Sequence, residues 1–296
     1  MFLFQKIEET MMKYSDARHA VGEFVIREQE ELYKYTISEI AERTYTSKAT
    51  VVRFAQSMGY DGWKEFMKDY IEEVRYKKAH ENGIDYNFPF KENDNTDTII
   101  DNLKKLQIET INETADLLDQ KMIDLAVSYI EKAHNVVIFG ASPNSYMGEL
   151  FKRKLFTIGK MATVAINGET GIIAASMTPD DCAVVISYSG NNPGKDPIDK
   201  IAVLKKHKVP IIGITSGGNN FMRDNLDCIF TMTSRERLLT KISNFSTEES
   251  INFIFNVIYS CLFAKDYRNN KNFKIYNSRL LEQGRNTLIK DLQDKD

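Results

Sequence analysis

The sequence TISEIAERTYTSKATVVRFAQSMG, residues 36–59, carries the signals for two short helices separated by a tight turn. Thr36 and Glu39 have the spacing of a capping box, in which each side chain bonds the other residue's backbone amide at the start of a helix. Ser47 is suited to a second N-cap, and Gly59 to the position after the last helical turn. Apolar residues recur at helical spacing in both segments. The stretch therefore predicts a helix-turn-helix pair.

The second helix of such a pair can lie in the major groove of DNA, with the residues near its N-terminus against the base edges. Hydroxyl groups there can bond phosphates or bases, and Lys and Arg can bond phosphate or guanine. The predicted DNA-binding residues are Thr46, Ser47, Lys48, Thr50 and Arg53. The same spacing also fits an ordinary helical hairpin with no nucleic-acid partner.

The chain has 296 residues, enough for two domains, and 42% of them are hydrophobic, which supplies cores for both. No apolar run reaches the roughly 18 residues of a membrane span, and Lys6 interrupts the apolar start, so we expect a cytoplasmic protein without a signal peptide. Cys182, Cys228 and Cys261 lie far apart in apolar runs and form no ligand pattern with the histidines, so neither metal nor cofactor is predicted. The net charge of −3 argues against a broad basic DNA-binding surface but allows a local one.

The periodicity of apolar residues divides the chain into two domains and a linker. Helical patterns on both sides of the central pair predict an all-helical domain over residues 1–76, with its first helix at 15–32. Residues 77–96 are polar, contain Gly and Pro and have no sustained period, which is typical of a linker. Residues 97–296 are predicted to form the second domain, which begins with two helices.

Five short apolar runs in the second domain alternate with helix-length segments. Continuous apolar strands joined by helices indicate a parallel sheet that is covered on both faces. The expected strands are 136–139, 162–166, 183–186, 211–214 and 229–232. The predicted fold class is therefore α + α/β, an all-helical N-terminal domain followed by a doubly wound, five-stranded parallel sheet with flanking helices.

Small polar residues follow the first, third and fourth of these strands. Ligands of such sheets bind at the carboxyl ends of the strands. Hydroxyls, amides and backbone N–H groups gathered there suit a phosphate group. These residue types also populate ordinary turns, but three such loops on one rim favour a binding site. With one carboxylate added from the start of the last apolar helix, the predicted ligand-binding residues are Gly140, Ser142, Asn144, Ser145, Ser187, Ser189, Gly190, Asn192, Thr215 and Glu249.

These loops contain no histidine that could activate a serine, and the chain has neither a Walker-type phosphate motif nor a Gly-x-Gly-x-x-Gly sequence after the first strand. Glu248 and Glu249 begin the long apolar helix after the last strand. Either carboxylate could serve as the base of a proton-transfer isomerase. Acidic residues in a first helical turn more often stabilise the helix dipole, and no catalytic residue is predicted.

Residues 38–66 resemble the N-terminal helix-turn-helix domain of the RpiR family of bacterial transcriptional regulators. The matching residues are Ser47, Thr50, Val51, Arg53, Phe54, Gly59, Tyr60, Gly62, Trp63, Glu65 and Phe66. Residues 136–233 resemble the SIS (sugar isomerase) domain of that family, with ISYSGNN at 186–192 as its phosphate loop. The chain departs from the family pattern at Tyr45, where the turn usually has glycine, at Asn144, where the first ligand loop has serine, and at Asn192, where isomerases commonly have threonine.

The resemblance implies a transcriptional regulator of carbohydrate metabolism rather than an enzyme, whose operator binding is controlled by a phosphorylated sugar in the SIS domain. A hypothesis built on this layout is that the chain forms a homodimer or homotetramer through the SIS domains and the long helices and binds a double-stranded operator with an inverted repeat. Two other classes stay open. One is a phosphosugar aldose–ketose isomerase with Glu248 or Glu249 as its base, and the other is a sugar-phosphate sensor that acts through protein partners.

Overall fold

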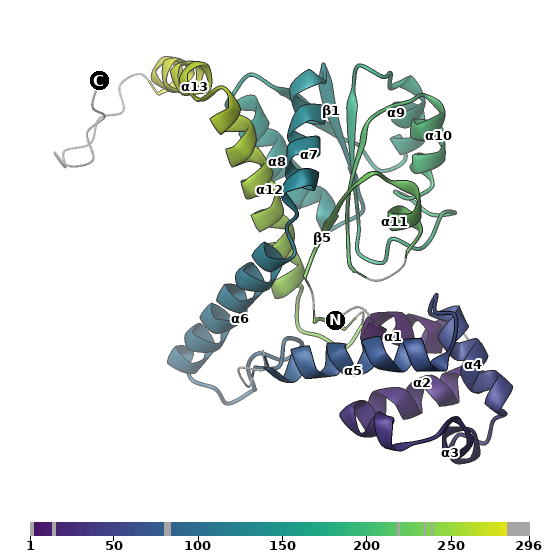
Figure 1. The fold of residues 1–296 in the computed structure, drawn as a ribbon. Helices are drawn as coiled ribbons and strands as arrows, with labels where there is room; N and C mark the ends of the chain where they lie inside the picture. The colour runs from purple at the N-terminus through teal and green to yellow at the C-terminus, as the bar shows by residue number, and fades with distance from the viewer. Residues whose placement is uncertain are drawn as a thin grey trace.

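The computed structural model describes residues 3–13, 16–79, 84–217, 220–233, 235–237 and 239–282. These residues form a helical head and a sheet domain (Figure 1). The head faces one end of the sheet (Figure 1). Residues 84–95, the described part of the connection between the two domains, contain no helix or strand. The predicted boundaries of the domains stay predictions.

The described residues of the head form α-helices and one short 3-10 helix. Their bounds are α1 Leu3–Lys13, α2 Ala17–Glu28, η1 Gln29–Lys34, α3 Ile37–Arg43, α4 Lys48–Ser57 and α5 Trp63–Ala79. The sequence pattern did not predict α1, which packs along α2 and buries Leu3 and Ile7 in the head core. Residue 15 of the helix predicted at 15–32 lies outside the described residues. The rest is observed as α2 and η1, because the backbone turns at Gln29, whose φ is 46°.

The caps predicted in residues 36–59 are confirmed. The Thr36 N–H donates to Glu39 Oε2 at 2.7 Å, and the Glu39 N–H donates to Thr36 Oγ1 at 3.3 Å. The Ser47 hydroxyl accepts the Thr50 N–H at 3.1 Å. Gly59 has a φ of +88° directly after the C-cap of α4, as expected for the glycine that ends a helix. The local sequence therefore determines where both helices of the pair begin.

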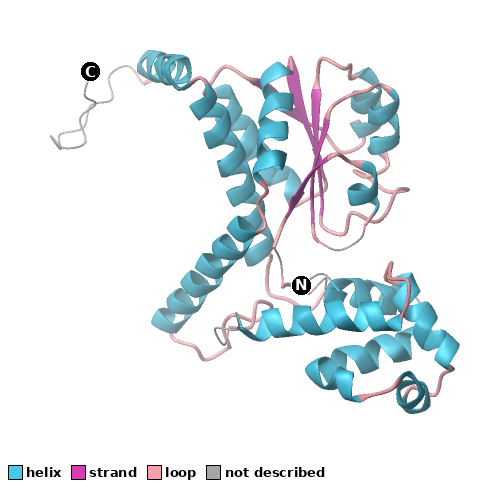
Figure 2. Ribbon diagram, in the orientation of Figure 1, coloured by secondary structure: helices cyan, strands magenta, loops and turns pink. Residues whose placement is uncertain are grey.

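The sheet domain alternates strands and helices after two initial helices. Its elements are α6 Thr96–Asp116, α7 Gln120–Lys132, β1 Asn135–Gly140, α8 Asn144–Phe156, β2 Met161–Val164, α9 Thr170–Ser176, β3 Cys182–Ser187, α10 Lys200–Lys206, β4 Ile211–Thr215, α11 Phe221–Asn225, β5 Cys228–Thr231, α12 Phe245–Lys265 and α13 Tyr267–Leu281. The five strands pair in parallel in the order β2-β1-β3-β4-β5. Figure 2 shows the sheet between its flanking helices. The predicted fold class is confirmed. In this order the winding reverses between β1 and β3, where doubly wound sheets bind ligands.

Helices cover both faces of the sheet. Side chains alternate along each strand, so every strand contributes residues to the core on each face. Ile138 of β1 and Val184 of β3 belong to the core beneath α7, α8 and α12. Phe139 and Val185, one position further along the same strands, belong to the core beneath α9, α10 and α11. Since both faces are filled by apolar side chains, the carboxyl ends of the strands are the part of the sheet at which a polar ligand can bind.

Cys182 and Cys228 are buried and Cys261 is partly exposed, and all three are free. Burial raises the pKa of the Cys228 thiol to about 12 and holds that of Cys182 well above its usual range, so both are unreactive thiols. Of the helices that the structure describes, none is long and apolar enough to cross a membrane.

Candidate functional site

The predicted DNA-binding residues surround the N-terminal end of α4. The side chains of Ser47, Lys48 and Arg53 are exposed, and those of Thr46 and Thr50 are partly exposed. The Ser47 and Thr50 hydroxyls lie 2.9 Å apart, and the Ser47 cap orders the first turn. The other side of α4 is buried in the head core, which fixes the orientation of this polar end.

The turn before α4 contains a tyrosine with a left-handed backbone. Tyr45, which stands where the RpiR pattern usually has glycine, has a φ of +53°. The Thr46 N–H donates to the Ala41 carbonyl at 2.8 Å across the turn. Tyr45 therefore adopts a conformation in which glycine is unstrained and a tyrosine is not. Its ring is 98% exposed and lies beside the predicted DNA-binding residues.

The carboxyl ends of β1 and β3 form one side of a cavity of about 1190 Å³. Asn144 lines it from the start of α8, Ser187 lines it from the last position of β3, and Ser189 and Asn192 line it from the loop after β3. These four predicted ligand residues therefore converge on one cavity, at the point where the winding of the sheet reverses. Their hydroxyls and amides can bond the oxygens of an anionic ligand.

The loop after β3 has its observed conformation without strain only with glycine at position 190. Gly190 has a φ of +63°, and a Cβ atom there would lie 2.5 Å from Thr215 Oγ1 and 2.7 Å from Asn220 Oδ1. The Met222 N–H donates to the Gly190 carbonyl at 3.1 Å, and the Gly190 N–H donates to Ser187 Oγ at 3.3 Å. These contacts fasten the loop to the end of β4 and to the start of α11.

Six predicted ligand residues lie outside the lining of this cavity: Gly140, Ser142, Ser145, Gly190, Thr215 and Glu249. Thr215 is fully buried, and its hydroxyl donates to the Tyr188 carbonyl at 3.3 Å. Thr215 and Gly190 therefore shape the loop instead of facing the cavity. Asn144 lines the cavity from the first turn of α8, at the position where the family pattern has serine.

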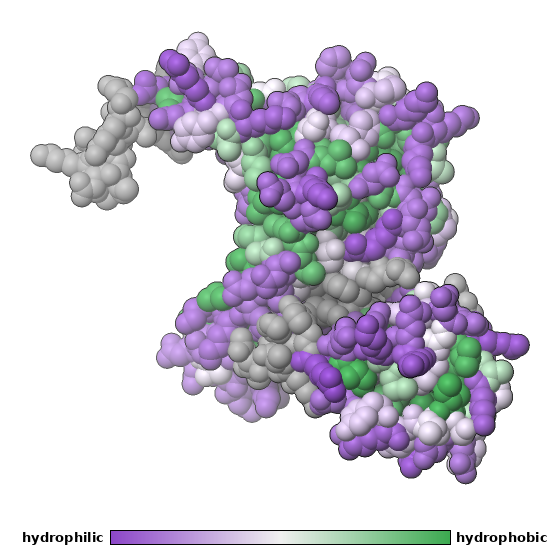
Figure 3. All heavy atoms as spheres, viewed as in Figure 1, coloured by the Kyte–Doolittle hydropathy of each residue, from purple (hydrophilic) through white to green (hydrophobic). Residues whose placement is uncertain are grey.

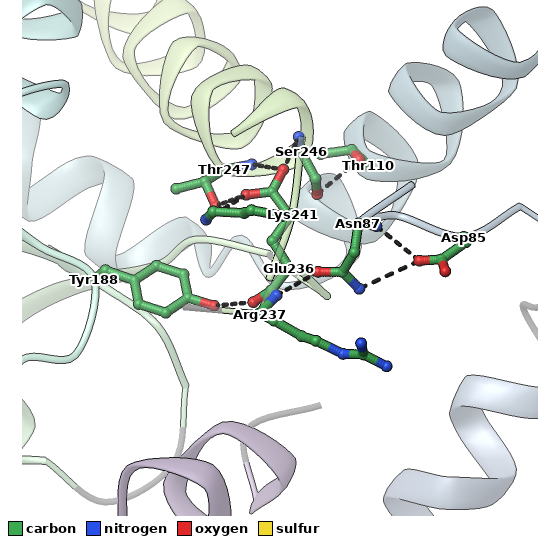
Figure 4. A network of polar contacts seen from close by, with 9 residues as sticks. All are labelled: Asp85, Asn87, Thr110, Tyr188, Glu236, Arg237, Lys241, Ser246 and Thr247. Carbon is green, nitrogen blue, oxygen red and sulfur yellow. Dashed lines mark hydrogen bonds and ion pairs between the residues drawn. The ribbon is translucent and has the colours of Figure 1, made fainter. Parts of the chain in front are cut away.

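Glu236 is a buried acidic residue that sequence reasoning missed. It follows β5, is 1% exposed, and accepts the Ser246 N–H at 2.5 Å and the Thr247 hydroxyl at 2.7 Å (Figure 4). Its carboxylate thus occupies the N-terminus of α12, where the helix dipole favours a negative charge. Glu248 and Glu249 lie in the first turns of α12 and do not line the cavity. Burial, followed by the charge of Glu236, raises the pKa of Glu248.

Tyr188 links the loop after β3 to the connection between the domains (Figure 4). Its hydroxyl donates to the Glu236 carbonyl at 3.0 Å. The next residue, Arg237, donates its N–H to Asn87 Oδ1 at 2.6 Å, and the Ile242 N–H donates to the Asn87 carbonyl at 2.9 Å. Asn87 is 7% exposed and lies between the head and α6. One chain of hydrogen bonds therefore joins the loop after β3, the segment after β5 and the interdomain connection.

A buried ion cluster anchors the same connection to α6. Arg235 Nη1 lies 3.2 Å from Glu109 Oε1, and Arg235 also pairs with Glu113 one helical turn further along α6. The guanidinium lies over the ring of Tyr86, 4.9 Å from its centroid. The side chains of the three charged residues are at most 7% exposed, so each charge depends on the others for compensation.

The head forms the other side of the cavity. Lys6 and Thr10 line it from α1, and Gln56, Ser57 and Gly59 line it from the C-terminal end of α4. Lys6 Nζ donates to the Met58 carbonyl at 2.7 Å, so α1 and α4 are joined at the cavity wall.

A helix-turn-helix head joined to a doubly wound sheet with a polar rim defines a class of two-domain regulatory proteins. The family model described as "Helix-turn-helix domain, rpiR family" matches residues 1–75, and the SIS domain model matches residues 129–247. The chain belongs to the RpiR family and is a transcriptional regulator with a SIS domain. The resemblance found in the sequence is thereby confirmed.

The alignments with three similar proteins cover most of both chains in each case. An uncharacterized HTH-type transcriptional regulator of Haemophilus influenzae is 23% identical over 88% of this chain and 89% of its own. The HTH-type transcriptional regulator HexR of Pseudomonas aeruginosa is 20% identical over 77% of this chain and 78% of its own. The solved structure of the Vibrio vulnificus NanR protein complexed with ManNAc-6P has a TM-score of 0.59, with 20% identity over 94% of this chain and 97% of that one. At this identity, the likeness to NanR shows a shared fold.

Proposed function

We propose that this regulator binds a double-stranded operator through the N-terminal end of α4 and that a phosphorylated sugar in the SIS domain controls this binding. The observation that carries the proposal is the convergence of Asn144, Ser187, Ser189 and Asn192 on one cavity at the switch point of the sheet. Neutral hydrogen-bond donors at the ends of parallel strands suit a phosphate group. The ManNAc-6P bound by the similarly folded NanR protein supports this class of ligand.

The exposed polar end of α4 supports the DNA-binding part of the proposal. Arg53→Ala should weaken binding to an operator selected from random duplexes by about 1–3 kcal/mol if the guanidinium bonds a base edge. Lys68→Ala is the matched control, because Lys68 is an exposed cation of α5 in the same head. Equal affinities of the Arg53 variant and the wild type would remove Arg53 from the DNA-binding face.

We further propose that the regulator acts as a homodimer or homotetramer on an inverted repeat. One side of α12 is buried in the sheet domain, while Phe253 and Val257 on another side are only partly buried. Apolar residues are visible along α12 in Figure 3, whereas hydrophilic residues cover much of the head. Apolar helix surfaces of this kind support association of two copies through the sheet domains. Sedimentation that gives a monomer at micromolar concentration would contradict this part of the proposal.

A thermal-shift screen with hexose and pentose monophosphates tests the ligand class, because a ligand selective for the native state raises the melting temperature. Ser189→Ala should reduce the shift that the best ligand produces in the wild type. Ser176→Ala, which removes an exposed hydroxyl outside the cavity, should leave the shift unchanged. Absence of any shift in the wild type would contradict the ligand class.

The same incubations separate the regulator from the isomerase. Glu248 and Glu249, the carboxylates that would act as bases, lie outside the cavity lining, which supports a non-catalytic protein. Turnover of any sugar phosphate in the panel would favour the isomerase. Ligand binding without sequence-selective DNA binding at moderate salt would favour a sensor that acts through protein partners.

A further inference from the structure

We propose that the helical head is part of the effector site, and that Lys6 together with the C-terminal end of α4 contacts the bound sugar phosphate. The inference rests on the proposed function and deepens it, because it states how the ligand reaches the DNA-binding helix. The sugar phosphate would bind both domains at once and hold the head in one orientation against the sheet domain.

The cavity itself provides the first argument. Its walls come from the strand ends on one side and from α1 and α4 on the other. In Figure 1 the head accordingly lies opposite the end of the sheet from which the loops after β1 and β3 emerge. The cavity volume of about 1190 Å³ exceeds the roughly 300–1,000 Å³ of ordinary small-molecule sites. A bound sugar phosphate would therefore not fill the cavity, and the head could move toward the sheet domain.

Charge provides the second argument. Among the described residues that line the cavity, Lys6 is the one cation, and Asp196 and Asp224 are anions. The side chains at the ends of β1 and β3 are neutral, whereas a phosphate monoester carries a charge of about −1.5 to −2 at neutral pH. A nearby ammonium group stabilises such a charge more strongly than neutral donors do. The bond from Lys6 to the Met58 carbonyl places this ammonium at the end of α4.

The position of α4 provides the third argument. Its N-terminal end carries Ser47, Lys48 and Thr50 of the predicted DNA-binding face, and its C-terminal end places Gln56 and Ser57 in the cavity wall. The helix has ten residues, which at about 1.5 Å per residue makes it one short rigid rod. A ligand held between the strand ends and Gln56 therefore sets the direction of the DNA-binding end. The head can take more than one orientation against the sheet domain. The ligand favours one of these orientations, because only there can it contact the head as well as the strand ends.

The first experiment measures calorimetric affinity for the hexose or pentose monophosphate that gives the largest thermal shift with the full-length wild type. Lys6→Met should weaken binding about tenfold or more, the range of a lost hydrogen bond to a charged group. Lys6→Arg should restore most of the affinity, because it keeps the charge. Lys68→Met controls for the loss of one positive charge elsewhere on the head, and its affinity should equal that of the wild type.

A second pair of variants keeps the test decisive if Lys6→Met fails to fold. Gln56 is exposed, so its replacement leaves the head core intact. Gln56→Glu should weaken binding of the same sugar phosphate several-fold, and Gln56→Lys should strengthen it, because only the sign of the charge at the cavity wall differs. Equal affinities of the two variants, or wild-type affinity of a folded Lys6→Met protein, would overturn the inference.

Amide hydrogen exchange provides a readout that a structural role of Lys6 would not change. Saturating sugar phosphate should slow exchange at residues 187–192 and also at 56–59, in the full-length protein. Protection confined to 187–192 would contradict a role of the head and leave the proposed function intact. If no panel member binds the wild type, the proposed function fails, and this inference fails with it.

Discussion

Replacement of Gly190 by alanine tests whether the loop after β3 is held as the structure shows. Alanine at a φ of +63° costs roughly 1 kcal/mol of backbone strain. The added methyl group would also lie 2.5 Å from Thr215 Oγ1 and 2.7 Å from Asn220 Oδ1, so both side chains must move. Each hydrogen bond that they lose contributes about 1 kcal/mol. Gly190→Ala should therefore lower the free energy of unfolding by about 3 kcal/mol in total.

Two other glycines provide matched controls. Gly168 has a φ of +90°, and a methyl group added there would meet no atom beyond its chain neighbours within 4 Å, so Gly168→Ala should show the backbone strain alone, about 1 kcal/mol. Gly171 lies in α9 with an ordinary φ and open space around it, so Gly171→Ala should be neutral or should stabilise the helix by up to about 1 kcal/mol.

Urea and thermal unfolding measure this series. With about 2–4 °C for each kcal/mol in a domain of this size, Gly190→Ala should melt roughly 6–12 °C below the wild type, and Gly168→Ala roughly 2–4 °C below it. Sugar-phosphate binding should fall for the Gly190 variant and not for the controls. Equal losses of stability at positions 168 and 190 would show that Thr215 and Asn220 do not crowd the loop, and would refute this reasoning.

Three further predictions concern charge and strain. Arg235→Met removes the partner of two buried carboxylates and should lower the free energy of unfolding by about 3–5 kcal/mol in urea titrations; a loss below about 1 kcal/mol would contradict the buried pairing. Burial raises the pKa of Glu248 above its usual 4.5, so its ionisation disfavours the folded state as pH rises through that raised pKa. Glu248→Gln should therefore have a higher melting temperature than the wild type at about pH 8, and the two melting temperatures should become equal near about pH 4. A difference in melting temperature that grows toward acid pH would contradict a raised pKa of Glu248. Tyr45→Gly relieves the backbone strain at a φ of +53° in a fully exposed residue. In chemical unfolding it should stabilise the head by about 0.5–1 kcal/mol. A destabilised variant would show that the tyrosine ring makes stabilising contacts.

The features that the sequence predicts well are those that neighbouring residues determine. The capping box of Thr36 and Glu39 and the cap at Ser47 each involve residues three positions apart, so their types and spacing suffice. The five strands are predictable because a doubly wound sheet buries both faces, which leaves continuous apolar runs in the sequence. The end of β2 is the exception, since the apolar run continues to residue 166 while pairing ends at Val164.

The features that the sequence does not predict depend on residues far apart in the chain. Arg237 and Asn87 are 150 positions apart, and neither lies in a pattern that indicates the other. Glu236 could have been noticed because it follows β5, yet its role as a cap depends on the start of α12 ten residues later. The contribution of Lys6 to the cavity needs the placement of α1 against α4, which no local pattern specifies.

The separation of the cavity rim from the hydrophobic cores of the sheet domain bears on how the preference for the proposed sugar phosphate can change. The residues at 189–192 lie outside both hydrophobic cores, and the loop is attached to its surroundings through the backbone of Gly190 and through Asn191 Oδ1, which accepts the Phe221 N–H at 3.1 Å. Substitutions at Ser189 or Asn192 therefore change the polar groups that line the cavity without removing a core side chain. With the proposed function, a protein built on this frame can acquire a new effector by exchanging a few rim residues, while the sheet beneath them stays the same.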